Sequence, residues 1–257
     1  MTYNRLTWGL FLTFIVSINY VNGQDWDTDS DYFNNLNTIT TAVPFLTITP
    51  DSRAGSMGEV GAATTADLYS LHWNPAKLAF VDAQTAGSIS YTPWLKKLVP
   101  DIAMSYLTAY NRINENSAVS GGLRYFSLGE ITFTDSSGSF IKTYSPNEFS
   151  FDFGYGMKFS NNFSGGLAMR YIYSNLTGGQ NVGEMETQPG QAFAVDLGTY
   201  YESDFNDNNQ WAIGLNISNI GTKIAYTVDE NEDFLPTNLK IGGRYSMKID
   251  DFNKFSI

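Results

Sequence analysis

The single histidine of the chain is the first candidate for chemistry, because acyl hydrolases and metal sites both use this residue. His72 lies between Leu71 and Trp73, and the 257-residue sequence has one His and no Cys. Catalytic zinc usually takes several His or Cys ligands, and the sequence lacks the Gly-x-Ser-x-Gly pattern of a hydrolase nucleophile. We therefore expect a structural or aromatic-stacking histidine, with no catalytic residue, no metal and no cofactor.

Four charged residues lie on the small-residue side of alternating segments. They are Asp152, Arg170, Asp196 and Arg244. Charges of both signs among Gly, Ala and Ser are typical of the polar interior of a β-barrel. Internal ion pairs in a filled interior are the more common arrangement, and a lining for a permeation path is the alternative.

Acidic residues gather in two of the longer predicted connections, where they could contact a partner. They are Glu184, Glu186, Asp229, Glu230, Glu232 and Asp233. Ordinary loop solvation explains them equally well. The formal net charge of −11 argues against nucleic acid as a partner, because phosphate contacts need clustered Lys and Arg.

The elements that must position these groups are strands with a two-residue period. From Glu148 to Phe159, aromatic residues alternate with small or charged ones. Related patterns occupy residues 166–173, 193–198, 211–218 and 239–248, with weaker ones at 86–94, 101–112 and 117–127. Strands of this length, with aromatic residues near their ends, favour an all-β, antiparallel transmembrane β-barrel whose apolar face meets lipid. A soluble β-sandwich is the alternative on pattern alone.

The connections between these strands alternate in length. Short ones are predicted at 113–116, 160–162, 203–209 and 249–252, and long ones at 95–100, 128–147, 177–190 and 222–236. In bacterial barrels the short turns are periplasmic and the long loops are external. We count about eight strands and the start of a ninth after Phe252. The sequence therefore predicts the N-terminal part of a longer barrel, truncated at its C-terminal end.

The residues before the first strand divide into three parts. Residues 1–23 read as a secretory signal peptide, because Arg5 precedes an apolar run, Leu6–Val16, that is too short for a spanning helix of about 20 residues. Residues 24–43 form a polar lead-in. Residues 44–85 form a plug or hatch, expected at the periplasmic mouth or inside the barrel, and residues 86–257 form the partial barrel.

The plug carries the most specific motif of the sequence. After His72 and Trp73, the run Asn74-Pro75-Ala76 predicts a helix start, with Asn as the cap and Pro at the first helical position. The segments PFLTITPDSRAGSMGEVG and SLHWNPAKLAF resemble the FadL-like outer-membrane barrels, whose Asn-Pro-Ala lies in an N-terminal hatch. They are similar in particular to the PorV family, the FadL-like barrels of the type IX secretion system. SNIGTKIAY and LPTNLKIG extend this resemblance more weakly.

The resemblance implies a non-enzymatic protein of the bacterial outer membrane. Such a protein would bind the C-terminal signal domains of secreted cargo, receive them from the translocon barrel and pass them to the surface sortase and attachment complex, surrounded by outer-membrane lipid. A FadL-like transporter of hydrophobic small molecules is the alternative. A lipid-modifying enzyme is the weakest hypothesis, because the only histidine lies in the plug.

Overall fold

The structure, a computed structural model, describes residues 40–94, 97, 101–134, 137–179, 186–206, 208–227, 232–250 and 252–257. The predicted signal peptide, and the lead-in as far as residue 39, lie outside the described residues. Both stay predictions.

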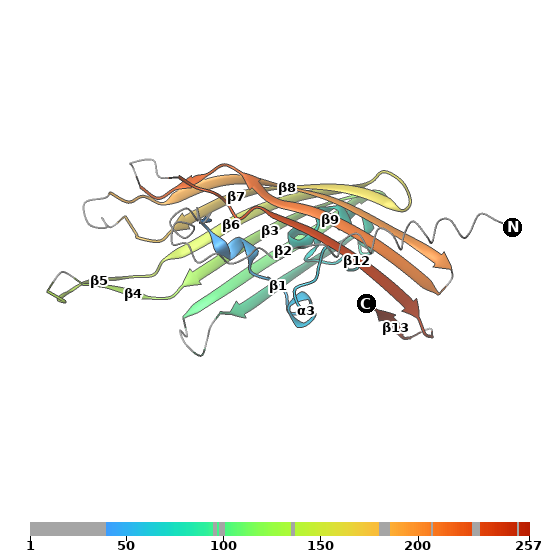
Figure 1. Cartoon of the computed structure of the whole chain (residues 1–257), viewed down its shortest axis with the longest axis horizontal. Helices are drawn as coiled ribbons and strands as arrows, with labels where there is room; N and C mark the ends of the chain where they lie inside the picture. The colour runs from blue at the N-terminus through green and yellow to red at the C-terminus, as the bar shows by residue number, and fades with distance from the viewer. Residues whose placement is uncertain are drawn as a thin grey trace, which may run out of the picture. The chain divides into compact units, whose positions relative to one another are not determined.

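One large antiparallel sheet dominates the described chain (Figure 1). Its nine strands are β1 (Thr85–Pro93), β2 (Ile102–Asn114), β3 (Ser117–Leu128), β6 (Asn147–Lys158), β7 (Phe163–Asn175), β8 (Gly190–Asn206), β9 (Asn209–Gly221), β12 (Asn238–Lys248) and β13 (Lys254–Ser256). Each strand pairs with the next along the chain, in the order β1-β2-β3-β6-β7-β8-β9-β12-β13. All eight predicted strands and the short ninth are therefore present.

Two small ladders occupy connections that the sequence predicted as loops. β4 (Ile131–Thr134) pairs with β5 (Phe140–Tyr144), and β10 (Ile224–Ala225) pairs with β11 (Glu232–Asp233). The short connection predicted over 203–209 is present but shorter than predicted, because β8 continues to Asn206 and β9 begins at Asn209. The polar composition of that stretch concealed a strand end that extends beyond the core.

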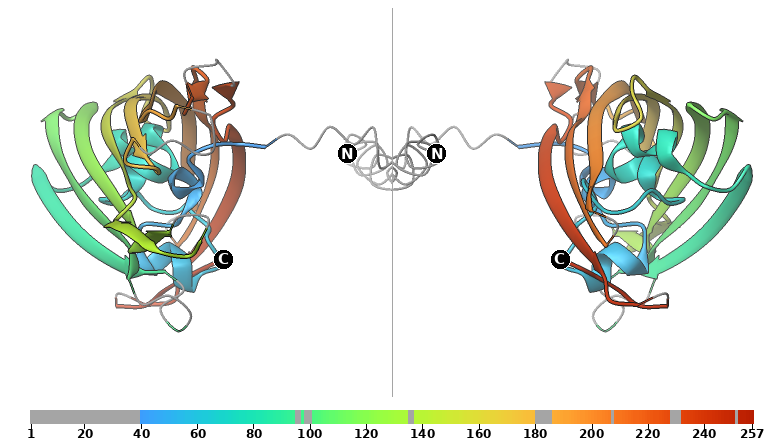
Figure 2. Two further views of the ribbon diagram at one scale, coloured as in Figure 1. Left: turned by 90° about the vertical axis from the view of Figure 1, so that its left-hand side faces the viewer. Right: turned by 90° about the vertical axis from the view of Figure 1, so that its right-hand side faces the viewer.

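The sheet is curved but open. Figure 2 shows it wrapped around the helical segment that precedes β1. In the described residues β1 and β13 form its two edges, so the sheet does not close into a barrel. Since consecutive strands are antiparallel, their connections alternate between two ends. The long connections lie together to the left in Figure 1 and the short turns to the right.

The two faces of the sheet differ in chemistry. The outward face displays large apolar side chains, such as Phe153, Phe193 and Ile241, which are 57%, 64% and 69% exposed. The face toward the helical segment carries small and polar residues, including Ser150 and Asn216, both fully buried. The two-residue period thus places apolar side chains outside and polar ones inside, the reverse of a water-soluble β-sandwich.

The helical segment contains η2 (Pro44–Thr47), α3 (Ser52–Ser56), α4 (Ser70–Trp73) and η3 (Pro75–Phe80). η3 packs against β6, β7 and β8 toward the short-turn end, whereas η2 packs near the long connections. Residues 44–80 therefore extend along the concave face of the sheet. Of the two positions expected from the sequence, this arrangement is nearer to the interior than to the mouth alone. None of the helices in the described part of the chain is long and apolar enough to cross a membrane.

Candidate functional site

The Asn-Pro-Ala motif fixes the helical segment to the sheet. The Asn74 side chain accepts a hydrogen bond from the Ala76 amide at 3.1 Å, which is the predicted cap. Its Nδ2 donates to the carbonyl of Ala62 at 3.1 Å and to that of Thr199, in β8, at 3.0 Å. The fully buried Asn74 therefore caps η3, which is a 3-10 helix, and also satisfies two backbone carbonyls.

Glycines in the sheet allow this close approach. A Cβ at Gly166 would overlap the backbone of Pro75 and Ala76, and one at Gly214 would overlap the carbonyl of Ala62. Only glycine leaves room for main chain to lie directly on main chain at these positions.

His72 and Trp73 add two further contacts, one to the sheet and one within the helical segment. The Trp73 indole donates to Asp51 Oδ2 at 2.9 Å, while Asp51 Oδ1 caps α3 by accepting from the Ala54 amide at 2.6 Å. Arg124 Nη2 lies 2.8 Å from His72 Nδ1. Because a guanidinium can only donate, Nδ1 must accept, so His72 is neutral with its proton on Nε2. Burial, together with Arg124, lowers the pKa of His72 well below 6.5, in agreement with this geometry.

The inward charges form a buried network centred on Arg170. This side chain contacts Asp152 at 2.5 Å and Asp196 at 3.1 Å, and its Nη1 also donates to Asn219 Oδ1. The pairing of β8 with β9 has a bulge at Asp196, and Asn219 has a left-handed φ of 59°. In this geometry the Asn219 amide donates a hydrogen bond to Asp196 Oδ1 at 2.7 Å. The network thus joins β6, β7, β8 and β9 beneath the helical segment.

Comparison of the sequence with known protein families gives a match over most of the chain. Residues 31–257 match the family model described as Type IX secretion system protein PorV. The chain belongs to the PorV family. No curated protein matches it.

The fourth inward charge of this PorV-family chain lies apart from the Arg170 network. Arg244 is buried and its Nη2 contacts Glu202 at 3.3 Å and Gln210 at 2.9 Å. Glu202 also accepts from the Tyr200 hydroxyl at 2.9 Å. The structure therefore places three of the four predicted charges in one cluster and Arg244 in a second cluster nearer the short turns.

The acidic residues predicted to contact partners fall only partly within the described chain. Glu186 is exposed, and Glu232 lies 3.8 Å from Lys223 in an exposed pair. Asp233 pairs with Ile224 in the β10–β11 ladder. The remaining three, Glu184, Asp229 and Glu230, lie outside the described residues. Each described member belongs to a connection at the long-connection end.

Two buried cations of this PorV-family chain were missed from the sequence. Arg124 is fully buried. It lies on the same inward face of β3 as Gly122 and Ser120, two and four residues away, so the alternation of the strand could have predicted its burial. Lys77 is also fully buried and donates to the Gly61 carbonyl at 2.8 Å and to Thr64 at 2.9 Å. Burial lowers the pKa of Lys77 to about 8. Its place in the short predicted helix AKLAF gave no sign of burial.

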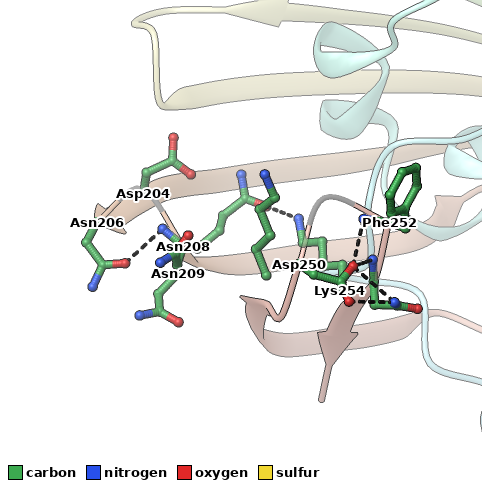
Figure 3. A pocket seen from close by; sticks show the side chains of 10 residues that line it. Asp204, Asn206, Asn208, Asn209, Asp250, Phe252 and Lys254 are labelled. Carbon is green, nitrogen blue, oxygen red and sulfur yellow. Dashed lines mark hydrogen bonds between the residues drawn. The ribbon is translucent and has the colours of Figure 1, made fainter.

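A hollow at the short-turn end has a polar lining (Figure 3). One contact links two of its strands, because Lys254 Nζ donates to Gln210 Oε1 at 3.2 Å. Asp250 Oδ1 accepts from the amides of Phe252 and Asn253 at 2.8 and 2.7 Å, and Asn206 Oδ1 accepts from the Asn208 amide at 3.0 Å. These bonds shape two turns. Among the described residues no group of three or more His, Cys, Asp or Glu side chains could hold a metal ion.

Proposed function

We propose that this chain is an outer-membrane component of the type IX secretion system. In this role it binds the C-terminal signal domains of secreted cargo, receives them from the translocon barrel and passes them to the surface sortase and attachment complex. Membership of the PorV family supports a role in secretion. The membrane location and the transfer of cargo are our inferences.

The apolar outward face is the observation that carries the membrane assignment. Met169, in the middle of β7, and Leu239, near the start of β12, are both 57% exposed. Exposure of such large apolar side chains to water is unfavourable. An apolar patch that follows a whole sheet indicates a surface covered by something apolar. Lipid is the natural cover for strands with a polar opposite face, so we propose that the sheet is part of a transmembrane barrel with the long connections outside.

We propose that residues 44–85 form the plug of this barrel. The contacts of Asn74, the close approach at Gly166 and the buried hydrogen bond of Trp73 support a segment that stays packed on the sheet. Buried charges fill the adjacent sheet face, which favours a closed interior over an apolar conduit for hydrophobic small molecules.

The experiment replaces acidic residues at the two ends separately. One variant carries Glu186→Gln, Glu232→Gln and Asp233→Asn, in the long connections. The control carries three neutralising changes at the short-turn end, at Asp82, Glu115 and Asp204. Both variants lose three formal charges, so a nonspecific effect of net charge is matched. A purified cargo signal domain is then captured on each variant of the full protein in detergent.

We expect the long-connection variant to retain less cargo domain, and to lose its binding more slowly as salt increases, because attraction between charges is screened by ions. The short-turn control should bind as the parent protein does. Capture of cargo by neither the parent nor the control would contradict the proposed function. Equal capture by all three proteins would exclude these acidic residues as the contact.

A further inference from the structure

The chain reaches the concave face of the sheet from the end that carries the long connections. Thr41 forms a parallel β-bridge with Phe234, and the Ala42 amide donates to the Phe234 carbonyl at 3.0 Å. Phe234 belongs to the connection between β9 and β12, at the long-connection end. The chain leaves the concave face through Thr85, the first residue of β1, at the short-turn end. Residues 41–85 therefore run from one end of the sheet to the other.

The first residues of this path pack tightly under the long connections. Phe45 is fully buried and stacks on Phe126 of β3, with ring centroids 6.2 Å apart. Leu46 belongs to the same apolar cluster as Met104. Val43, 1% exposed, has φ 49° and ψ 51°, a left-handed conformation that is unusual for a β-branched residue. Such a conformation persists only where the surrounding contacts fix it.

Arg124 fixes the path from the sheet side. Its Nη1 donates to the Leu46 carbonyl at 2.9 Å, its Nη2 contacts His72, and its guanidinium lies 5.3 Å from the centre of the Tyr106 ring. In the described residues it forms no salt bridge, so the Leu46 carbonyl is one of few acceptors for a fully buried cation. Withdrawal of residues 43–46 would leave Arg124 short of acceptors, which disfavours opening.

We propose that Thr40–Thr47 is a strap that closes the interior at the long-connection end. The Phe234 carbonyl holds it at Ala42, and the Arg124 side chain of β3 holds it at Leu46. Thr40 and Thr41, both exposed, then belong to the same surface as the long connections. That this surface faces outward rests on the proposed function. The strap differs from a plug seated only at the periplasmic mouth, because its first residues would be accessible from the cell exterior.

Single cysteines test the path, since the chain has no Cys. Thr40→Cys is compared in the full protein with Thr143→Cys, an exposed position in β5, and with Glu115→Cys, an exposed position in a short turn. Intact cells are treated with a bulky maleimide that does not cross the outer membrane, and permeabilised cells give the total. We expect Thr40→Cys and Thr143→Cys to react fully on intact cells, and Glu115→Cys to react only after permeabilisation.

The outcomes separate the strap from the proposed orientation. If Thr143→Cys reacts on intact cells but Thr40→Cys either behaves like Glu115→Cys or never reacts, the strap is wrong and the orientation stands. If only Glu115→Cys reacts on intact cells, the orientation is wrong. Thr40→Cys should even then match Thr143→Cys, because the strap places both at one end.

A second measurement tests closure. Met104→Cys lies beneath the strap, where Met104 is 1% exposed, and should be protected from a small impermeant maleimide. Adding Arg124→Gln should speed its labelling on intact cells at least tenfold. Adding Arg112→Gln, at the short-turn end, should leave it protected. Protection unchanged by Arg124→Gln would overturn the role of Arg124 as the clamp of the strap.

Discussion

At the scale of a single residue, His72 makes the stability of the protein depend on pH. Burial and Arg124 hold its pKa in the folded state well below 6.5, so the folded protein keeps His72 neutral. The unfolded chain takes up a proton as the pH falls below about 6.5, and the folded protein does not. The stability contributed by the neutral His72 is therefore fully present above pH 6.5 and is lost progressively as the pH falls below that value.

His72→Gln should remove this part of the pH dependence. Gln can still accept a hydrogen bond from Arg124 but does not titrate in this range. We expect the thermal midpoint of the purified wild-type protein in detergent to decrease more between pH 7.5 and 5.5 than that of His72→Gln. Carboxylates affect both proteins alike, so the difference isolates His72. Identical decreases would show that His72 is solvated or protonated in the folded protein.

At the scale of the strand, the outward face of β7 distinguishes lipid from water. Met169 is 57% exposed in the middle of β7, and Phe140 is 68% exposed in β5, which lies outside the main sheet. Met169→Lys should destabilise the protein by about 2–4 kcal/mol in a bilayer, because Lys at mid-membrane loses its hydration. Phe140→Lys should cost little, because it remains in water. The two variants are compared by denaturant titration of folding into vesicles, and equal midpoints would contradict a lipid-facing β7.

At the scale of the whole molecule, the proposed plug should control leakage. Asn74→Ala removes a cap worth about 0.5–2 kcal/mol, and Trp73→Ala leaves a cavity worth about 3–5 kcal/mol because Trp73 is 6% exposed. The double variant of the full protein should still reach the outer membrane but pass ions and small antibiotics. Single-channel recording and antibiotic sensitivity measure this leakage.

Trp211→Ala is the matched control for this variant. It also removes an indole, but from the outward face, where Trp211 is 36% exposed and lies 5.0 Å from the Tyr201 ring. Cells with this control should be no more permeable than wild type. A double variant as tight as wild type would show that residues 44–85 do not seal the interior.

The sequence alone determined the strands of the main sheet and which of their side chains share a face. Side chains alternate across a sheet with a period of two, so the pattern around Phe151 and Asp152 predicts both the strand and its two faces. The cap at Asn74 was equally predictable, because Asn before Pro satisfies amides that any helix start leaves free. Both the alternation of a strand and the cap of a helix depend on residues adjacent in the sequence, so the sequence is sufficient to predict them.

Only the tertiary structure decided which side chains meet. Arg170 pairs with Asp152 on the neighbouring strand, but its contact with Asn219 depends on a bulge that no alternation pattern reveals. The route of residues 41–85 along the sheet, and the burial of Arg124 beneath Leu46, depend on packing between segments far apart in sequence. Alternation fixes the face on which a residue lies, whereas its partner is fixed by register, curvature and the segment that fills the concave side.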